Sequence, residues 1–161
     1  MTAPGTDESQ VGEALSALRQ IVHSLHRASR SAERVHGVSG AQLFVLQLLA
    51  DAPANSLNAL AERTLTHQSS VSVVVSRLVA RGLVDRKRSP EDGRRIELSL
   101  SPAGEELLAR APAAMQIRLI EALRGMPKRE LRTLAGLLTE LVSAMGAAAE
   151  STGFLFEDAE A

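Results

Sequence analysis

Residues 56–100 constrain the fold more than any other part of the chain. Residues 56–63 and 68–80 have the pattern of two short helices joined by a tight turn, and the segments 83–88 and 95–100 have the pattern of two hairpin arms. Two helices joined by a turn and followed by a hairpin have the layout of a winged helix-turn-helix, which places one helix in a groove of duplex DNA. The sequence therefore predicts a mainly α fold with a small β-hairpin wing.

The second helix of this stretch is rich in valine, whose β-branched side chain favours strands. The positions of the valines favour a helix instead, because they place an apolar face opposite a slim one. The buried face would hold Val71, Val74, Val75 and Leu78, and the outward face Ser69, Ser72, Val73, Ser76 and Ala80. Burial of the apolar face outweighs a helix propensity penalty of well under about 1 kcal/mol per residue. We therefore expect a helix over residues 68–80.

The outward face of this helix offers groups that read DNA. Gln68 can hydrogen-bond an adenine edge, Val73 can pack against a thymine methyl group, and Arg77 can reach a guanine or a phosphate. At the tip of the hairpin, Arg94 fits a narrow minor groove, where the potential is most negative. The alternative is an ordinary solvated face, but such faces usually carry Glu, Lys and Gln rather than Ser and Val.

The charge distribution agrees with a DNA-facing surface in this part of the chain. Residues 63–95 carry eight Lys or Arg and three Asp or Glu, a local net charge of +5 in a chain whose formal net charge is −1. Binding to a polyanion requires a local basic face, because charges farther apart than a Debye length of about 8–10 Å are largely screened. The near-neutral total therefore does not exclude DNA binding.

The flanking parts of the chain read as helices and two tails. Residues 1–8 are small and polar and predict a disordered tail, and residues 148–161 form an acidic C-terminal tail. Residues 9–37 read as a long helix ended by Gly37, with apolar side chains at steps of four and three. These side chains are Val11, Leu15, Leu18, Val22 and Leu25. From spacing alone, this apolar seam packs equally well on a second chain or within its own domain.

Capping residues and prolines set the remaining boundaries. Ser39 fits a capping box at the start of the helix that precedes the helix-turn-helix. Pro102 fits the first turn of another helix, which we expect to run to about Arg124 with a bend near Pro112. A last helix with an apolar seam follows. These boundaries give a winged helix-turn-helix DNA-binding domain at residues 38–101 and a helical region at residues 9–37 and 102–147.

Composition and motifs exclude several classes of protein. The chain has no Cys, which excludes disulfides, thiolate metal sites and cysteine-based redox switches. No apolar stretch is long enough to span a bilayer, and the N-terminus lacks the pattern of a signal peptide, so we expect a cytoplasmic protein with no membrane partner. Glycine-rich phosphate loops and the GxSxG and HExxH motifs are missing from the sequence, so we predict no catalytic residues, no cofactor and no metal.

Motifs in the same stretch resemble the MarR family of bacterial transcription regulators. The most specific part is the spacing from Gly82-Leu83-Val84 through Asp92-Gly93-Arg94 to Leu98-Ser99-Leu100-Ser101. Further matching residues are Leu60-Ala61-Glu62-Arg63, Gln68-Ser69-Ser70-Val71-Ser72, Arg77-Leu78-Val79-Ala80-Arg81, Arg86 and Ala103-Gly104. The resemblance covers about residues 39–108 by motif and the flanking helices by length and order.

The resemblance implies an obligate homodimer held by the N-terminal helix and the last two helices. It also implies binding to a pseudo-palindromic double-stranded DNA operator, usually to repress neighbouring genes, and release by a small, often aromatic or anionic, effector. By carry-over, the groove-facing side chains would be Gln68, Ser69, Ser70, Ser72, Val73 and Arg77 in the major groove and Arg94 in the minor groove. The residue-level argument adds Ser76, Arg86, Arg88 and Arg95 to this DNA-binding set.

Ligand pockets in the MarR family lie between the dimer-forming helices and the winged helix, which suggests five candidate residues. His23 and His26 share a helix face and can line a pocket, sense pH or bind a metal. The simpler interpretation is two partly exposed histidines, because no Asp or Glu at ligand spacing completes a metal set. Phe44, Met115 and Arg118 offer a flat wall, an adaptable filler and an anion partner, although core packing or a surface salt bridge explains each alone.

A winged helix that serves only as a protein–protein scaffold is the alternative from a different functional class. A scaffold would not need the basic side chains of the hairpin all together. These are Arg86, Lys87, Arg88, Arg94 and Arg95. The hairpin charges therefore favour DNA binding.

Overall fold

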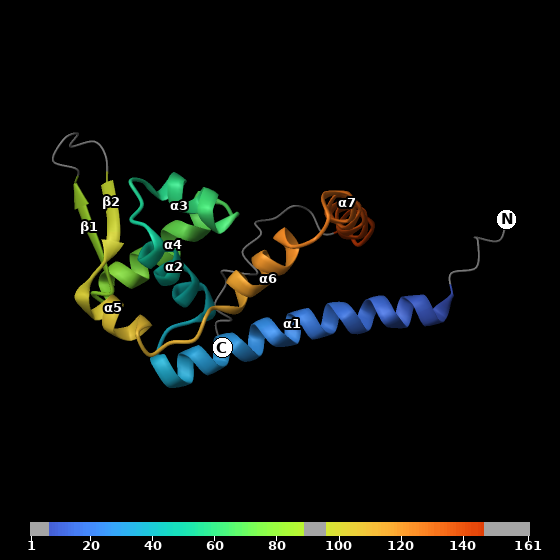
Figure 1. Cartoon of the computed structure of the whole chain (residues 1–161), viewed down its shortest axis with the longest axis horizontal. Helices are drawn as coiled ribbons and strands as arrows, with labels where there is room; N and C mark the ends of the chain where they lie inside the picture. The colour runs from blue at the N-terminus through green and yellow to red at the C-terminus, as the bar shows by residue number, and fades with distance from the viewer. Residues whose placement is uncertain (1–6, 89–95, 147–161) are drawn as a thin grey trace.

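The computed structural model describes residues 7–88 and 96–146, and it has the helix and hairpin order that the sequence predicts (Figure 1). The chain runs through α1 (Glu8–His36), α2 (Gly40–Asp51), α3 (Leu57–Thr64), α4 (Gln68–Ala80), β1 (Val84–Arg88), β2 (Ile96–Leu100), α5 (Pro102–Leu108), α6 (Met115–Arg124) and α7 (Lys128–Ala144). The fold is mainly helical with one antiparallel hairpin, which confirms the predicted fold class. The first helix begins at Glu8, at the end of the segment for which a tail was expected.

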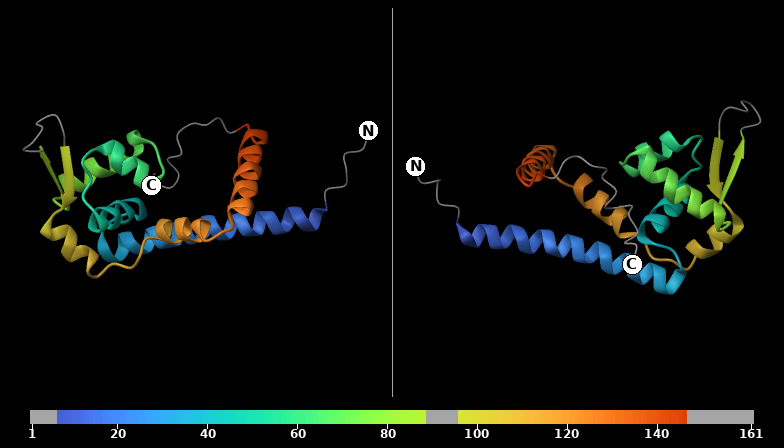
Figure 2. Two further views of the ribbon diagram at one scale, coloured as in Figure 1. Left: turned by 45° about the horizontal axis from the view of Figure 1, so that its top comes forward. Right: turned by 180° about the vertical axis from the view of Figure 1, so that it is seen from behind.

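A winged-helix body occupies one end of the molecule, where α2, α3, α4 and the hairpin pack around a single core (Figures 1 and 2). The largest fully buried side chains of this core are Phe44, Leu46, Leu60, Leu78, Leu98, Val38, Val45, Val71, Val74 and Val75. Helix α5 packs on α2 and β2 and therefore belongs to this body. The core consists almost entirely of aliphatic side chains, as expected for a chain with three Phe and no Trp or Tyr.

Local capping chemistry sets the helix boundaries at the start of the body. Gly37 adopts a left-handed conformation with φ +68° and ends α1. Ser39 then caps α2, because its hydroxyl accepts from the Gln42 N–H while the Gln42 side chain accepts from the Ser39 N–H. The predicted capping box is confirmed. At α3, the hydroxyl of Ser56 accepts from the Ala59 N–H.

The valine-rich segment is a helix, as its spacing predicts. Val71, Val74, Val75 and Leu78 are all buried, whereas Val73 is 52% exposed on the opposite side. The tertiary burial of one face has overridden the strand propensity of its valines. Helix α4 packs against α2 and α3, and Val73 lies on its exposed face.

The two predicted arms pair as an antiparallel hairpin, and a third short segment joins it. Val84 lies opposite Leu100, and Arg88 lies opposite Ile96. Ala54, between α2 and α3, forms two backbone hydrogen bonds with Leu98, at 2.9 and 2.7 Å. This bridge fastens the hairpin to the loop before α3. The residues between the two strands, 89–95, lie outside the described residues.

The single helix predicted from Pro102 to Arg124 is wrong, because two helices occupy this region. Helix α5 ends at Leu108 and α6 begins at Met115. Pro112 has no N–H to donate and disfavours helical geometry at the residue before it. The Pro112 carbonyl oxygen and the Ala114 N–H both bond to the side chain of Gln47 on α2. This side chain replaces part of the missing helical ladder.

The remaining helices form an arm that extends away from the body (Figures 1 and 2). Helix α1 packs on α2 and α6 through its C-terminal half, where Leu25 and Ala32 are buried, and its N-terminal half is exposed. No residue of α7 is buried, although its sequence carries a clear apolar stripe. Among the helices in the described parts of the chain, none combines the length and apolarity that crossing a membrane requires.

Candidate nucleic-acid interface and ligand pocket

The outward face of α4 consists of short side chains that lie open to solvent. Gln68, Ser69 and Ser76 are exposed, and Ser70 and Ser72 are half-buried. Val73 is the large apolar residue of this face. Serine and valine are short enough to let the helix backbone approach base edges, and their hydroxyl and methyl groups can contact both polar and apolar base edges. The face has the shape and the chemistry of a reading helix.

The N-terminus of α4 carries no side-chain cap among the described residues. His67 occupies the N-cap position, and its side chain accepts no hydrogen bond from the first turn. Free N–H groups at a helix start attract anions, because they add to the positive end of the helix dipole. A DNA phosphate near Gln68 would meet donors that the protein leaves unused.

Strand β1 of the hairpin contacts α4 and carries two exposed arginines. Arg86 and Arg88 are exposed and share one face of β1, because side chains two residues apart point the same way. Lys87 lies on the other face, where its Nζ is 3.7 Å from Asp85 Oδ2. Among the described residues, no carboxylate therefore forms an ion pair with Arg86 or Arg88.

Two arginines counted in the basic stretch are engaged inside the body. Arg63 donates to the carbonyl oxygens of Ala52, at 2.6 Å, and Leu48, and so caps the end of α2. Arg81, at the C-cap of α4, donates to Gln42 Oε1 at 3.1 Å. The basic surface available to DNA is therefore narrower than the sequence count of charges indicates.

The described residues hold part of the predicted DNA-binding set. The structure brings together Gln68, Ser69, Ser70, Ser72, Val73, Ser76 and Arg77 on α4, with Arg86 and Arg88 on β1. Arg94 and Arg95 lie outside the described residues, so their contribution stays a prediction from the sequence. The part of the interface that can be described is one helix face and one strand of the wing.

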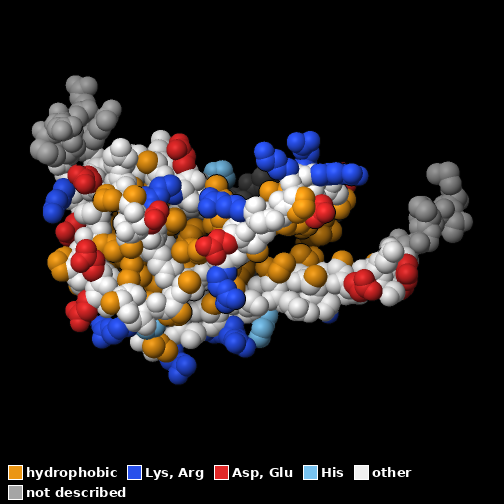
Figure 3. All heavy atoms as spheres, in the orientation of Figure 1, with side chains coloured by type: hydrophobic (Ala, Val, Ile, Leu, Met, Phe, Trp, Pro, Cys, Tyr) orange, Lys and Arg blue, Asp and Glu red, His pale blue; other side chains and the backbone are white. Residues whose placement is uncertain are grey.

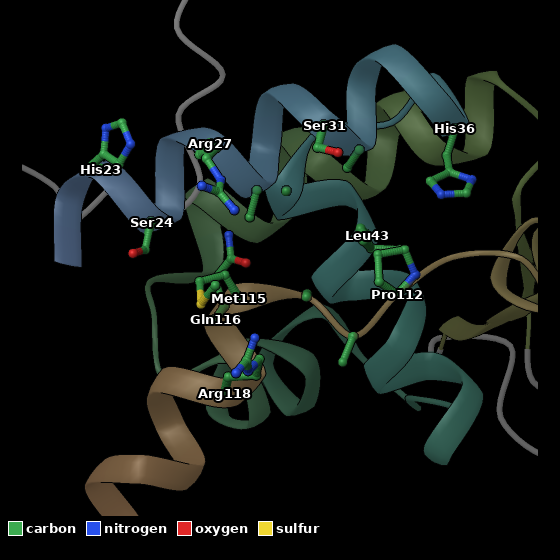
Figure 4. Close-up of a pocket in the computed structure, with 15 residues that line it drawn as sticks. His23, Ser24, Arg27, Ser31, His36, Leu43, Pro112, Met115, Gln116 and Arg118 are labelled. Atoms are coloured by element: carbon green, nitrogen blue, oxygen red, sulfur yellow. The ribbon is translucent and has the colours of Figure 1, made fainter. Parts of the chain in front are cut away.

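A pocket of about 370 Å³ lies at the joint between body and arm (Figure 4). Helix α1, the start of α2, the segment 112–114 and the start of α6 surround it. Arg27 extends from α1 toward Gln116 on α6 in this view, and Arg118 lies one turn of α6 away from Met115. The pocket therefore offers two guanidinium groups, a buried amide and an apolar floor around Leu43, a combination suited to a small anion with an apolar body.

The pocket contains three of the five predicted ligand residues. His23, Met115 and Arg118 line it. Phe44 is 1% exposed and packs in the core of the body, and neither Phe44 nor His26 is among the lining residues. The described residues bring no three His, Asp or Glu side chains close enough together to hold a metal ion.

Sequence reasoning missed several pocket residues. Arg27 stands one helical turn after His23 on the same face of α1, so helical spacing could have identified it. Gln116 and Leu43 could not be identified in this way, because their place in the pocket depends on how α2 and α6 pack together.

Comparison with known proteins identifies the family. The model of the MarR family matches residues 36–95. An uncharacterized HTH-type transcriptional regulator of Mycobacterium leprae is 37% identical over 130 residues, which cover 79% of this chain and 91% of that protein. The chain belongs to the MarR family. It is therefore a DNA-binding transcription regulator.

Solved structures agree with this assignment. YusO from Bacillus subtilis superposes on this MarR-family chain with a TM-score of 0.51 at 28% identity, covering 85% of this chain and 95% of YusO. The structure of BpsR from Bordetella bronchiseptica, whose DNA binding is regulated by 6-hydroxynicotinic acid, gives a TM-score of 0.56 at 24% identity over 91% of this chain and 99% of BpsR. The similarity to BpsR shows a shared fold.

Proposed function

We propose that the chain is a homodimeric repressor that binds a pseudo-palindromic DNA operator and is released by a small aromatic or anionic effector. The observation that carries this proposal is the exposed serine–valine face of α4 beside Arg86 and Arg88 of the wing. A dimer of such units would contact two half-sites about one helical turn of DNA apart, so the proposal requires an operator with two-fold symmetry. A protein seated over such a site hinders transcription from it.

In this proposal each side chain of the interface has one task. Gln68 and the α4 serines contact base edges in the major groove, and Val73 contacts a thymine methyl group. Arg77, Arg86 and Arg88 contact phosphates, and Arg94 and Arg95 extend the contact into the minor groove. Phosphate contacts fix the position of the protein on the duplex, whereas base contacts select the sequence.

The exposed apolar faces of α1 and α7 support the dimer. Val11, Leu15, Ile21 and Val22 of α1 are between 37% and 45% exposed. Helix α7 and its C-cap expose apolar side chains by between 41% and 71%, namely Leu137, Leu138, Leu141, Val142 and the C-cap Met145. An isolated amphipathic helix is marginal in water, so α7 needs a partner surface to remain helical. Hydrophobic side chains gather where α1 and the α6–α7 arm face each other (Figure 3), which suits the insertion of a second copy.

The pocket at the joint supports release by an effector. Arg27 and Arg118 match a carboxylate, and the apolar lining matches an aromatic ring. BpsR, which responds to an aromatic acid, has the same fold. A ligand seated between α1, α2 and α6 can bias the angle between body and arm, because it contacts both.

The test is to sequence the DNA that the purified protein captures from its own genome. The proposal predicts a pseudo-palindromic sequence enriched near promoters, and 6-hydroxynicotinate and related small aromatic acids are then screened for release of that DNA. Captured fragments without any shared two-fold sequence would contradict the dimeric operator. Failure of the tested aromatic acids to release the DNA would contradict the proposed class of effector.

A further inference from the structure

The side chain of Gln47 joins the DNA-reading body to the dimerisation arm. Gln47 lies in the middle of α2 and is half-buried. Its Nε2 donates to the carbonyl oxygen of Pro112 at 2.7 Å, and its Oε1 accepts from the N–H of Ala114 at 2.8 Å. The nitrogen and the oxygen of the Gln47 amide therefore each form a hydrogen bond with a backbone group of the segment that leads into α6.

Besides the burial of Ala114 and the packing of Ala111 against the core, the segment 109–114 has few described backbone hydrogen bonds. The N–H groups of Arg110 and Ala111 close turns back to α5, but Pro112 interrupts the helical ladder. Ala114 is the N-cap of α6, and its own side chain cannot cap the helix. Gln47 thus sets the position at which α6 begins, using a side chain that reaches across from α2.

A second tie fixes α2 to the arm at another point. The N–H of Gly40 donates to Ser29 Oγ of α1 at 2.9 Å, and a Cβ at residue 40 would lie 3.1 Å from Ser29 Cβ and 3.3 Å from Gln116 Nε2. Residues 40 and 47 are about 10 Å apart along a helix, given a rise of 1.5 Å per residue. Two attachments about 10 Å apart add to the packing of α2 on α1 and α6, and together they constrain the direction of α2.

The direction of α2 determines the direction of the reading helix. Helix α4 packs on α2 through its buried valines, and Arg81 at its end donates to Gln42 of α2 at 3.1 Å. Close-packed interiors transmit such shifts because they deform little. We propose that Gln47 is a positioning residue for operator recognition, which sets the angle between α4 and the arm and thereby the half-site spacing that the dimer accepts. This inference rests on the proposed dimeric function.

The chemistry of glutamine suits this position. Its amide offers a donor and an acceptor on one side chain, and the two backbone groups of the linker require one of each. Methionine has similar length and no strong hydrogen-bonding group, and glutamate can accept from Ala114 but cannot donate to Pro112. Gln47→Met and Gln47→Glu therefore remove both bonds or one of them while the volume changes little.

The test measures binding to the captured operator and to versions with one base pair inserted or deleted between the half-sites. One base pair moves a half-site by about 3.4 Å and rotates it by about 35°. The wild-type protein is expected to lose about tenfold or more in affinity on either altered spacing. Gln47→Met is expected to bind all three DNAs within about threefold of one another, with Gln47→Glu between the two.

Thr133→Ala is the matched control, because its hydroxyl bond to the Arg129 carbonyl stays within α7. It should keep the spacing preference of the wild-type protein, and circular dichroism melting confirms that each variant is folded. Equal spacing preference in the wild-type protein and folded Gln47→Met would overturn the role of Gln47. A wild-type protein that binds all spacings equally would overturn the dimeric operator model itself, so the two failures are distinguishable.

Discussion

A substitution at Val73 tests most directly whether the outward face of α4 contacts DNA. Large apolar side chains on a solvated helix face usually have a partner, and Val73 is 52% exposed in the middle of a face of serines. Its neighbours Val74 and Val75 are buried, so the same residue type serves two purposes within one turn. A methyl-bearing side chain between hydroxyls suits a surface that contacts thymine methyl groups.

Val73→Glu should abolish operator binding and leave the fold intact. The carboxylate would lie among phosphates, where like-charge contact costs several kcal/mol, so affinity should fall by roughly a hundredfold or more. Fluorescence anisotropy with the captured operator measures the loss, and Val73→Thr, which keeps the shape of the side chain, is the control. Retained binding by Val73→Glu would mean that another face of α4 meets the DNA.

Arg94→Ala should weaken operator binding by about 1–3 kcal/mol without changing the unfolding transition. Arg94 lies outside the described residues, so this prediction rests on its place in the hairpin sequence. Arg132→Ala removes the same charge from α7 and serves as the control, measured at matched salt. Equal affinities for the two variants would exclude a minor-groove role for Arg94.

At the scale of helices and strands, local signals in the sequence predict most of what the structure contains. Glycine at residue 37, the capping box at Ser39 and the valine spacing of α4 act over a few residues, and each prediction is confirmed. The break at 109–114 could not be predicted in full, because Gln47 is more than 60 residues away in sequence. The inward bonds of Arg63 and the bridge from Ala54 to Leu98 depend on the same kind of long-range packing.

Helix α5 lies so close to the start of the hairpin that adding one methyl group at Gly104 should destabilise the fold. A Cβ on Gly104 would lie 2.3 Å from the backbone carbonyl oxygen of Leu83 and 3.2 Å from Leu100 Cδ2. Because backbone atoms cannot yield as a flexible side chain does, Gly104→Ala should lower the free energy of unfolding by about 1–3 kcal/mol.

Gly12→Ala is the control for that substitution. Gly12 is exposed in α1 with nothing within 4 Å of an added Cβ, so the change should stabilise the helix by about 0.5–1 kcal/mol. Urea unfolding at one fixed protein concentration compares the three proteins. A Gly104→Ala protein as stable as the wild type would show that α5 does not pack this closely on the hairpin.

At the scale of the whole molecule, the arm leaves apolar side chains of α1 and α7 exposed. Helix α7 has no buried residue, and the apolar seam of α1 continues beyond its contact with α6. The sequence left open whether the α1 seam serves its own domain or a second chain. In the described structure the C-terminal half of α1 packs within the chain and the N-terminal half is exposed, so only the N-terminal half remains for the proposed second chain.

A double substitution of Leu138 and Leu141 by glutamate should convert a dimer into monomers or aggregates. Both residues are more than 40% exposed on one face of α7, and charges there would have to be buried in the dimer. Sedimentation velocity measures the change, and Glu140→Gln is the control on the same helix. A wild-type chain that sediments as a folded monomer at micromolar concentration would refute the dimer.

The most direct test of the whole interpretation is the salt dependence of binding to DNA from the promoter region of the protein's own gene. A dimer with at least six phosphate contacts should lose about a thousandfold in affinity between roughly 50 and 200 mM salt. Gel-shift or anisotropy titrations across that range give the slope, and the account predicts a steep, linear fall of log affinity with log salt. Purified, folded protein that shows no salt-sensitive attachment to any double-stranded DNA would contradict it.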